Sequence, residues 1–285
     1  MNLSSILILV TFALQGSGDV PAKYNPHAPA KDKVLAKVNG KEIKAEDVED
    51  LLWQWRGQEA LADLTSYQMM KDAATKRNVS VTDDEVEKAM TAQLAQVAQG
   101  MPAGANLDDY ILSQGFTKSR FWMRLKTQLL LDKMAAVDFK ATDYVKISSM
   151  VVKPESITSA SLQNAAKKAD LFYDKLIKGA KWEDVLNLST TDTNVLDAKG
   201  LLGWRRIDAF PEVVRNELLT LKPGGYTKPA QMPSGFQIFR LEMFGKDAKG
   251  KDLDDAIAIH AVSNRAKVLE KIRSESKVER IPQNS

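Results

Sequence analysis

Residues 144–152 read Tyr-Val-Lys-Ile-Ser-Ser-Met-Val-Val, and at this run the chain changes its structural pattern. The run is rich in the β-branched and apolar residues that favour strands. Before it, from residue 45 to about residue 139, apolar residues recur at helical spacing, and after it helix and strand patterns alternate up to Phe244. We therefore predict a nearly all-helical segment followed by an α+β unit of about 100 residues, which is a usual domain size.

The first part of the helical segment is divided by local turn signals. A hairpin is predicted for residues 34–43, because Asn39-Gly40 supplies the two positive-φ positions of a tight turn. From about Ala45 the spacing predicts a helix that Gly57 can end, and a further helical stretch continues to Asn78. The apolar stripe of the first helix comprises Val48, Leu51, Leu52 and Trp55.

Later helices have recognisable starts. Thr82-Asp83-Asp84-Glu85 is a capping box, and Asn106 and Thr117 each precede a helical pattern as N-caps. A last helical pattern runs from Leu253 to Ile272. Since a single amphipathic helix has no core of its own against which to bury its stripe, we predict that it packs on the N-terminal helices and that the middle unit is an insertion.

The N-terminus carries an apolar run from Ile6 to Leu14 and then small residues up to Gly18. This pattern is typical of a secretory signal peptide over residues 1–18, and it predicts export. It leaves open whether the segment is cleaved or is kept as an anchor that holds the protein near a membrane. Residues 19–33 contain three prolines and no apolar periodicity, so we predict a linker.

The composition excludes several classes of function. The chain has 285 residues, 44% of them hydrophobic, which is enough for one large or two ordinary domains. Its 40 Lys and Arg against 37 Asp and Glu leave a net charge of +3, so nucleic acid is not an expected partner. Without cysteine and with only His27 and His260, the chain offers no thiolate chemistry and no multi-histidine metal site.

Several stretches of the helical segment resemble the N-terminal domain of SurA- and PrsA-type foldases. They are residues 38–43 (Val-Asn-Gly-Lys-Glu-Ile), residues 79–86 around the capping box, Gly115-Phe116-Thr117 ahead of Phe121, and residues 128–134. The resemblance rests on the order and spacing of these motifs together. The resemblance implies a helical chaperone domain over residues 34–140 that a C-terminal helix, residues 248–285, completes.

A second and stronger resemblance extends from Lys146 to Leu241 and is to the parvulin (PpiC-type) prolyl-isomerase, or rotamase, domain. It rests on five ordered matches. They are Gly179-Ala180-Lys181-Trp182-Glu183-Asp184-Val185, Gly200-Leu201-Leu202-Gly203-Trp204, Phe210-Pro211-Glu212-Val213, Leu221-Lys222-Pro223-Gly224-Gly225 and Ser234-Gly235-Phe236-Gln237-Ile238. The fold class that the two resemblances imply is α+β, with a parvulin-like domain over residues 141–247 inserted in a mostly helical SurA-type domain.

The resemblances imply a periplasmic or otherwise extracytoplasmic folding factor whose partners are unfolded or partly folded exported polypeptides. We expect it to act mainly as an ATP-independent chaperone, and we expect no cofactor. Two alternatives are an active peptidyl-prolyl cis-trans isomerase and a structural envelope protein that is not a chaperone. Rotation about the X-Pro amide bond has a barrier of about 18–20 kcal/mol. An isomerase lowers this barrier with an apolar pocket for the proline ring and with groups that stabilise the twisted amide.

The resemblance also implies where an isomerase site would lie. Parvulins place one histidine on the first strand of the domain and another on the last, and the matching residues are Ser149 and Gln237. A third polar position matches Asp192. Ser149 and Gln237 can form hydrogen bonds but provide no imidazole ring, so the expected catalytic set of Asp192, Ser149 and Gln237 is degenerate.

The proline pocket of the family is commonly formed by Leu, Met and Phe, and the matching residues are Leu202, Ala209 and Val213. Phe236 is a further expected substrate contact. The two smaller side chains reduce the apolar area, since burying a large side chain contributes about 1.5–3 kcal/mol.

Aromatic and methionine side chains in the helical segment are candidates for client binding, because they adapt to many apolar partners. They are Trp53, Trp55, Tyr67, Met69 and Met70. Helical spacing alone would place most of them in a core. Trp53 and Trp55 are two residues apart and cannot face the same way, so we predict that at least one lies outside the core stripe.

Overall fold

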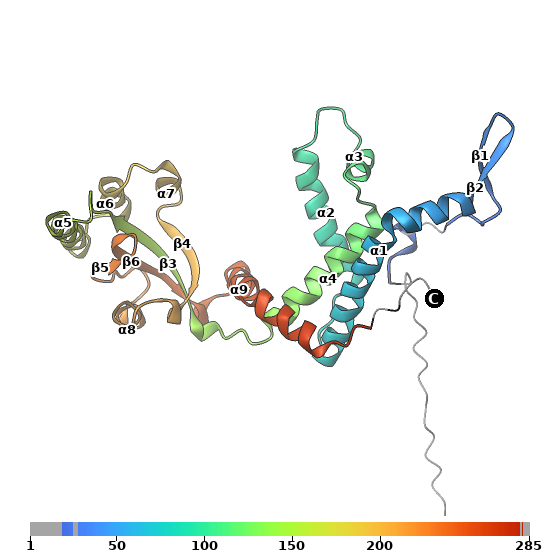
Figure 1. Ribbon diagram of the computed structural model, residues 1–285. Helices are drawn as coiled ribbons and strands as arrows, with labels where there is room; N and C mark the ends of the chain where they lie inside the picture. The colour runs from blue at the N-terminus through green and yellow to red at the C-terminus, as the bar shows by residue number, and fades with distance from the viewer. Residues whose placement is uncertain (1–18, 25–27, 280, 282–285) are drawn as a thin grey trace, which may run out of the picture. The chain divides into compact units, whose positions relative to one another are not determined.

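The structure is a computed structural model, and it describes residues 19–24, 28–279 and 281. The predicted signal peptide and His27 lie outside these residues. The fold class is α+β, as predicted, with helices and two small antiparallel sheets (Figure 1). The described part of the chain divides into a helical unit, which comprises the residues up to 134 and those from 265 onward, and a sheet unit, residues 135–264. In the part of the chain that is described, no helix is long and apolar enough to cross a membrane.

The helical unit begins with a hairpin of two strands and continues with four helices. These elements are β1 (Val34–Val38), β2 (Lys41–Lys44), α1 (Ala45–Lys76), α2 (Asp83–Gln99), α3 (Leu107–Ser113) and α4 (Lys118–Ala136), and the end of α9 (Lys251–Glu275) joins them. The predicted turn is confirmed, because Asn39 and Gly40 have φ of 51° and 80°. The capping box is also confirmed: the Glu85 amide donates to Thr82 Oγ1, and the Thr82 amide donates to Glu85 Oε2.

Helix α1 does not end at Gly57, so that expectation is wrong. The helix runs through Gly57 to Lys76, and Asn78 turns the chain with φ of 54°. The Trp53 indole lies against Gly57, where an added Cβ would stand 3.0 Å from Trp53 Cδ2 and Cε3. The glycine therefore does not break the helix but makes room for a ring one turn before it.

The core of the helical unit is apolar and joins residues from both ends of the chain. It contains Tyr67 and Met70 of α1, Val86 of α2, Trp122 of α4 and Ile272 of α9. Trp122, Val86 and Ile272 are fully buried. Residues 19–24, expected as a linker, contact this unit instead: Val20 and Tyr24 pack on the core, Tyr24 Oη donates to Glu87 at 2.8 Å, and Asp19 pairs with Lys71.

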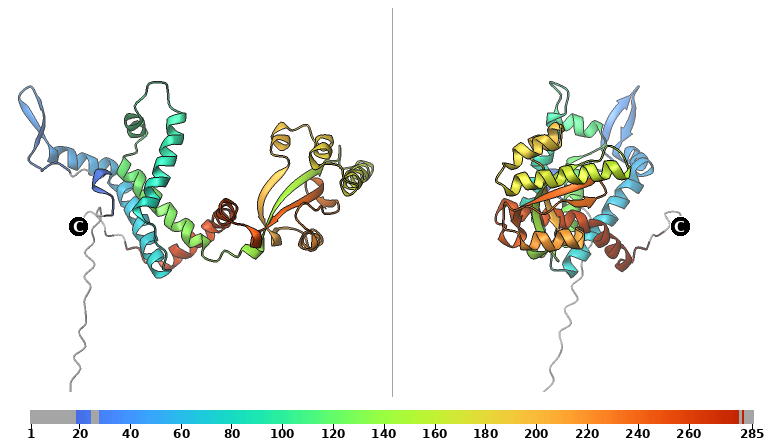
Figure 2. Two further views of the ribbon diagram at one scale, coloured as in Figure 1. Left: turned by 180° about the vertical axis from the view of Figure 1, so that it is seen from behind. Right: turned by 90° about the vertical axis from the view of Figure 1, so that its left-hand side faces the viewer.

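The sheet unit contains a four-stranded antiparallel sheet in the order β4–β3–β6–β5. The strands are β3 (Tyr144–Val152), β4 (Leu201–Arg206), β5 (Ala230–Met232) and β6 (Gly235–Phe244). The helices are α5 (Ser159–Ile177), α6 (Trp182–Ser189), α7 (Thr193–Asp197), α8 (Glu212–Thr220) and the start of α9. Figures 1 and 2 show α5 and α6 on one side of the sheet and α8 on the other.

The two faces of the sheet have separate cores. On one face, Met150 and Ile238 pack against α5 and α6. On the other, Ile147, Phe239 and Leu241 pack against α8. Neighbouring residues of a strand point to opposite faces, so Met150 and Ile238 lie on one face and Ser149 and Phe239 on the other.

The final helix does not pack on the helical unit alone. Residues 251–264 of α9 belong to the sheet unit, where Ala256 is buried with Tyr144 and Trp204. His260 is also buried there, with Nδ1 2.7 Å from Tyr144 Oη and Nε2 2.9 Å from the Asn264 amide. Only residues from 265 onward belong to the helical unit.

Candidate functional site

Ser149 and Gln237 lie next to each other on the α8 face of the sheet. Ser149 on β3 is opposite Phe239 of β6, so Gln237 is its diagonal neighbour on the same face. The Ser149 hydroxyl donates a long hydrogen bond of 3.5 Å to Gln237 Oε1, and the Gln237 amide donates to Ser234 Oγ. The structure thus brings together the two residues that replace the expected histidines.

Gly200, which precedes β4, contacts the backbone of β3 at Ser149. Its carbonyl accepts from the Ser149 amide at 2.8 Å, its φ is +70°, and a Cβ there would stand 2.6 Å from the Ser149 carbonyl oxygen. Only glycine fits such a left-handed position with so close an approach. The strand that follows the glycine is therefore held directly against β3.

The apolar surroundings of the pair come from residues that the sequence prediction did not select. Phe239 lies beside Ser149, and Phe210 packs edge-on to Phe239 with ring centroids 5.4 Å apart. Ala230 is directly opposite Gln237 on β5, and Met232 follows on the same face. Phe210 and Met232 therefore lie on the α8 face, together with Ser149 and Gln237.

The predicted pocket residues are dispersed. Leu202 falls at the bulge of β4, where Gly203 pairs with Ile147 and Leu201 pairs with Ser148. Val213 of α8 is 70% exposed, and the exposed Ala209 precedes α8. Phe236 packs with Met150 in the core on the opposite face of the sheet from Gln237. Of these four residues, the register places Phe236 on the opposite face of the sheet from Ser149, and a pocket formed by the other three stays a prediction.

Asp192 has a structural task. Its Oδ1 accepts from the amides of Asn194 at 3.0 Å and Val195 at 3.4 Å, which caps the N-terminus of α7. Within the described residues, no hydrogen bond connects Asp192 to Ser149 or Gln237. The α8 face therefore presents uncharged hydrogen-bonding groups at its centre, which can hold a peptide amide but cannot transfer a proton near neutral pH.

His260 is a buried titratable group of the sheet unit that lies outside the α8 face. Burial, and next the positive charge of Arg206, lower the pKa of His260. The ring of His260 contacts Phe139 and Tyr144. It is therefore a neutral packing residue of the α9 core and not a member of the α8 face.

Comparison with known proteins assigns the sheet unit. Residues 150–243 match the family model described as "Rotamase: PPIC-type PPIASE domain". This segment is similar to PPIC-type rotamase domains. The rotamase domain includes the Gln237 side of the α8 face, and Ser149 immediately precedes its first matched residue.

The curated relatives are SurA proteins. The chain is 30% identical to "Chaperone SurA" of Pseudomonas syringae pv. syringae (strain B728a) over 135 residues, which cover 47% of this chain and 30% of that protein. It is 24% identical to "Chaperone SurA" of Saccharophagus degradans over 242 residues, which cover 77% of this chain and 55% of that protein. The chain thus spans only about a third to a half of the length of these relatives.

Among solved structures, PrsA from Bacillus subtilis aligns over 90% of this chain and 97% of that chain, with 18% identity and a TM-score of 0.32. PrsA from Bacillus anthracis aligns over 77% of this chain and 99% of that chain, with 19% identity and a TM-score of 0.38. The family match and the SurA relatives support the predicted resemblance to SurA-type proteins that contain a parvulin domain.

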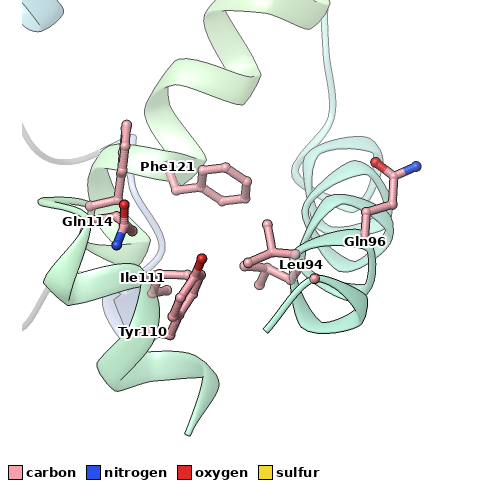
Figure 3. A pocket seen from close by; sticks show the side chains of 9 residues that line it. Leu94, Gln96, Tyr110, Ile111, Gln114 and Phe121 are labelled. Atoms are coloured by element: carbon pink, nitrogen blue, oxygen red, sulfur yellow. The ribbon is translucent and has the colours of Figure 1, made fainter. Parts of the chain in front are cut away.

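The helical unit contains a groove that the sequence prediction missed. It has a volume of about 470 Å³ and lies between α2, α3 and α4. In Figure 3, Leu94 of α2, Tyr110 and Ile111 of α3 and Phe121 of α4 point toward one another across it. Val97 and Phe116 complete the apolar lining, and Gln96 and Gln114 lie at its rim. In the sequence, Gly100, Pro102 and Gly104 interrupt the helical pattern and separate α2 from α3, which form two walls of the groove.

The side of the groove at Phe116 is basic. The guanidinium groups of Arg120 and Arg124 lie 5.6 and 5.4 Å from the Phe116 ring centroid, as expected for cation–π contacts. Both also donate to Asp63. Although burial raises the pKa of Asp63, hydrogen bonds from Arg124 and Arg120 outweigh it and hold that pKa below its usual value. The carboxylate therefore stays ionised and keeps both guanidinium groups beside Phe116.

Proposed function

We propose that the protein is an exported, ATP-independent chaperone of the SurA type that binds apolar segments of unfolded exported polypeptides in the groove between α2, α3 and α4. The SurA relatives support a folding chaperone. The observation that carries the proposal is the apolar groove itself, whose volume of about 470 Å³ falls in the range of about 300–1,000 Å³ typical of ligand sites.

The lining of the groove suits a client that varies in sequence. Aromatic and aliphatic side chains offer non-directional contact, and the glutamines at the rim can pair with the exposed backbone of an extended segment. Such a site binds weakly and releases its ligand quickly, since little of the contact is specific. This is what a protein that holds unfolded chains without ATP requires.

The test is suppression of client aggregation by a groove variant and a matched control. Val97→Gln with Tyr110→Gln makes two walls polar, and Val262→Gln with Val137→Gln makes two exposed surface positions polar. We expect the groove variant to bind an unfolded client at least about tenfold more weakly, which corresponds to about 1.4 kcal/mol. Equal activity of both variants and the parent chain would contradict the proposal.

The rotamase domain favours a second function, catalysis of X-Pro isomerisation. We infer that this activity is minor, because Ser149 and Gln237 replace histidines and the Asp192 carboxylate caps α7. A coupled assay on a proline-containing peptide should show little or no acceleration by the parent chain. Acceleration that disappears in Asp192→Ala would establish an active isomerase. A chain that neither binds unfolded clients nor accelerates isomerisation would point to the structural envelope protein.

A further inference from the structure

The sheet unit contains a polar pocket on the face opposite to Ser149 and Gln237. Ser148, the neighbour of Ser149 on β3, points to this face, and Arg240 of β6 is directly opposite Ser148. The pocket has a volume of about 360 Å³, and both residues line it together with the turn between α7 and β4, residues 198–199. We call it the Arg240 pocket. It shares no residue with the expected isomerase site or with the groove of the helical unit.

Arg240 has a buried donor without a partner in the described part of the chain. Its Nε is shielded from solvent but makes no hydrogen bond there. Glu242 Oε1 is 3.7 Å away, which is too far for a hydrogen bond, and this oxygen accepts from Ser148 Oγ at 2.7 Å instead. A buried donor without an acceptor destabilises the folded chain, and more so when its group is charged. Because native proteins leave few such donors unpaired, this one points to an acceptor that arrives with a ligand.

The pocket has an excess of positive charge. Lys146, Lys199 and Arg240 line it, and among the described residues that do so Glu242 is the one acidic residue. Lys146 is neutralised by Asp252, whose Oδ1 lies 2.7 Å from the ammonium group. When Asp252 is counted with Glu242, one net positive charge remains. The pocket therefore favours a monoanion over a dianion such as phosphate, which the Glu242 carboxylate repels more strongly.

The turn that carries Lys199 is held by the core of the sheet unit. The buried Trp182 donates from Nε1 to the Lys199 carbonyl at 2.9 Å, and Lys199 has a φ of 51°. Its ammonium group is 4.0 Å from a Glu183 carboxylate oxygen, but both side chains are largely exposed, so this ion pair is weak and leaves the cation available to a ligand. The backbone of the lysine is thus fixed before a ligand binds, which lowers the entropy cost of binding.

The remaining walls of the pocket are apolar. Leu201 of β4 is paired with Ser148, Met243 of β6 is paired with Lys146, and both line the pocket beside the charged groups. The volume of about 360 Å³ is many times the roughly 30 Å³ of a water molecule, so a bare inorganic ion would fill little of it. It lies in the range of about 300–1,000 Å³ typical of ligand pockets. The ligand should therefore combine one negative charge with a short apolar body.

We propose that the Arg240 pocket binds a small monocarboxylic acid in its ionised form. The carboxylate accepts from the guanidinium group of Arg240, whose planar fork suits two oxygens, and from the ammonium group of Lys199. The aliphatic part of the acid packs on Leu201 and Met243. Binding satisfies the buried donor of Arg240 and thereby stabilises the sheet unit. This site depends neither on client binding in the groove nor on isomerisation.

Titration of the parent chain with isovalerate, followed by the backbone amide signals in NMR spectra, tests the proposal. We expect saturable shifts of the signals of residues 146–148 and 198–201, with a dissociation constant on the order of 1 mM because the ligand has few atoms. Isoamyl alcohol has the same carbon skeleton without the charge and should leave these signals in place. Inorganic phosphate should bind at least about tenfold more weakly than isovalerate, because Glu242 repels its second charge.

Two variants and a matched control locate the binding. Arg240→Gln removes the guanidinium group and should raise the dissociation constant for isovalerate at least about tenfold. Lys199→Gln changes a largely exposed side chain, so it should fold normally, and it should raise the constant about threefold. The control is Arg215→Gln, which removes a half-buried arginine of α8 on the other side of the sheet and should leave the constant unchanged.

A parent chain without saturable shifts overturns the proposal, as does isoamyl alcohol or phosphate binding as tightly as isovalerate. Unchanged binding by both Arg240→Gln and Lys199→Gln overturns it too. So does binding of an acetylated and amidated peptide with one glutamate when isovalerate does not bind, because the carboxylate would then belong to a polypeptide. Thermal unfolding of each variant shows whether it is folded, and Lys199→Gln decides the outcome if Arg240→Gln is not.

Discussion

In the sheet unit, four polar residues are buried, namely Ser148, Ser149, Thr227 and His260, while in the helical unit none of the described polar side chains is buried. The helical unit instead exposes apolar side chains over its hairpin and the first half of α1. The sheet unit therefore combines its apolar cores with buried hydrogen-bonding groups, whereas the helical unit has an apolar core and exposes further apolar side chains elsewhere.

Truncation of a core residue and of an exposed residue on the same helix gives the largest effect. Met70→Ala should lower the free energy of unfolding by about 2–5 kcal/mol, because Met70 is only 2% exposed in the core of the helical unit. Trp53→Ala should change it by less than about 1 kcal/mol, because the ring is already half in solvent. Urea denaturation of both variants measures this. Equal losses would show that Trp53 is covered within the monomer.

Removing one hydroxyl should distinguish the two units. The Phe239 amide donates to Thr227 Oγ1 at 3.1 Å in the buried sheet, so Thr227→Val leaves that donor without a partner and should destabilise the protein by about 1–3 kcal/mol. Thr127→Val is the control in α4, where the hydroxyl only donates to the Met123 carbonyl within the helix. Its expected effect is within about 0.5 kcal/mol. Similar values for the two variants would remove the contrast between the units.

Acid should weaken the sheet unit through His260. Since burial and Arg206 lower its folded pKa, the unfolded chain takes up the proton first as the pH falls below the ordinary value of about 6.5. Stability should then fall with pH, by at most about 1.4 kcal/mol per pH unit, until the folded pKa is passed. Above about pH 6.5 the group contributes nothing to the slope.

His260→Gln keeps hydrogen-bonding capacity without titration, so unfolding curves of this variant should be flat between pH 6.5 and 5, a window above the usual carboxylate pKa values of about 4. The Asp63 carboxylate, whose pKa is lowered, loses its contribution only at still lower pH. A slope that is unchanged in His260→Gln would assign the acid sensitivity to another group.

The smallest effect concerns Gly57. In a Trp53→Ala background, Gly57→Ala should stabilise the helical unit by about 1 kcal/mol, which is the difference in helix propensity. With Trp53 present the gain should be smaller, because the new methyl group displaces the ring. The double-mutant cycle isolates this coupling. Additive effects would mean that the ring does not depend on the glycine.

The sequence was sufficient where the physical cause is local. Asn39-Gly40 and the capping box at Thr82 were predicted correctly, because a turn or a cap depends on a few neighbouring residues. The prediction that Gly57 ends the first helix was wrong, because helix propensity does not reveal the contact between Gly57 and the Trp53 ring. The stripe that includes Leu52 and Trp55 was periodic as predicted, but periodicity does not tell what covers a stripe.

The candidate site was predictable in part. The resemblance to parvulins implied that Ser149 and Gln237 face each other, and the strand register places them as diagonal neighbours. Phe236 adjoins Gln237 on the same strand, so alternation alone places it on the opposite face. Phe210 was missed in favour of Ala209, since only the tertiary contact with Phe239 shows which of the two neighbours turns inward. The groove forms where α2, α3 and α4 meet, so it could not be predicted from the pattern of any one of these segments.

The position of Ile272 has a consequence for how the protein itself folds. This fully buried residue of the helical core lies 136 residues after Ala136, where α4 ends, and most of the sheet unit lies between them in the sequence. During synthesis the sheet unit can therefore form its core while the core of α1, α2 and α4 still lacks Ile272. The helical unit must close a long loop before its core is complete, because α9 is the last helix to be made. Until then its N-terminal helices are incompletely folded, as are the polypeptides that folding factors protect.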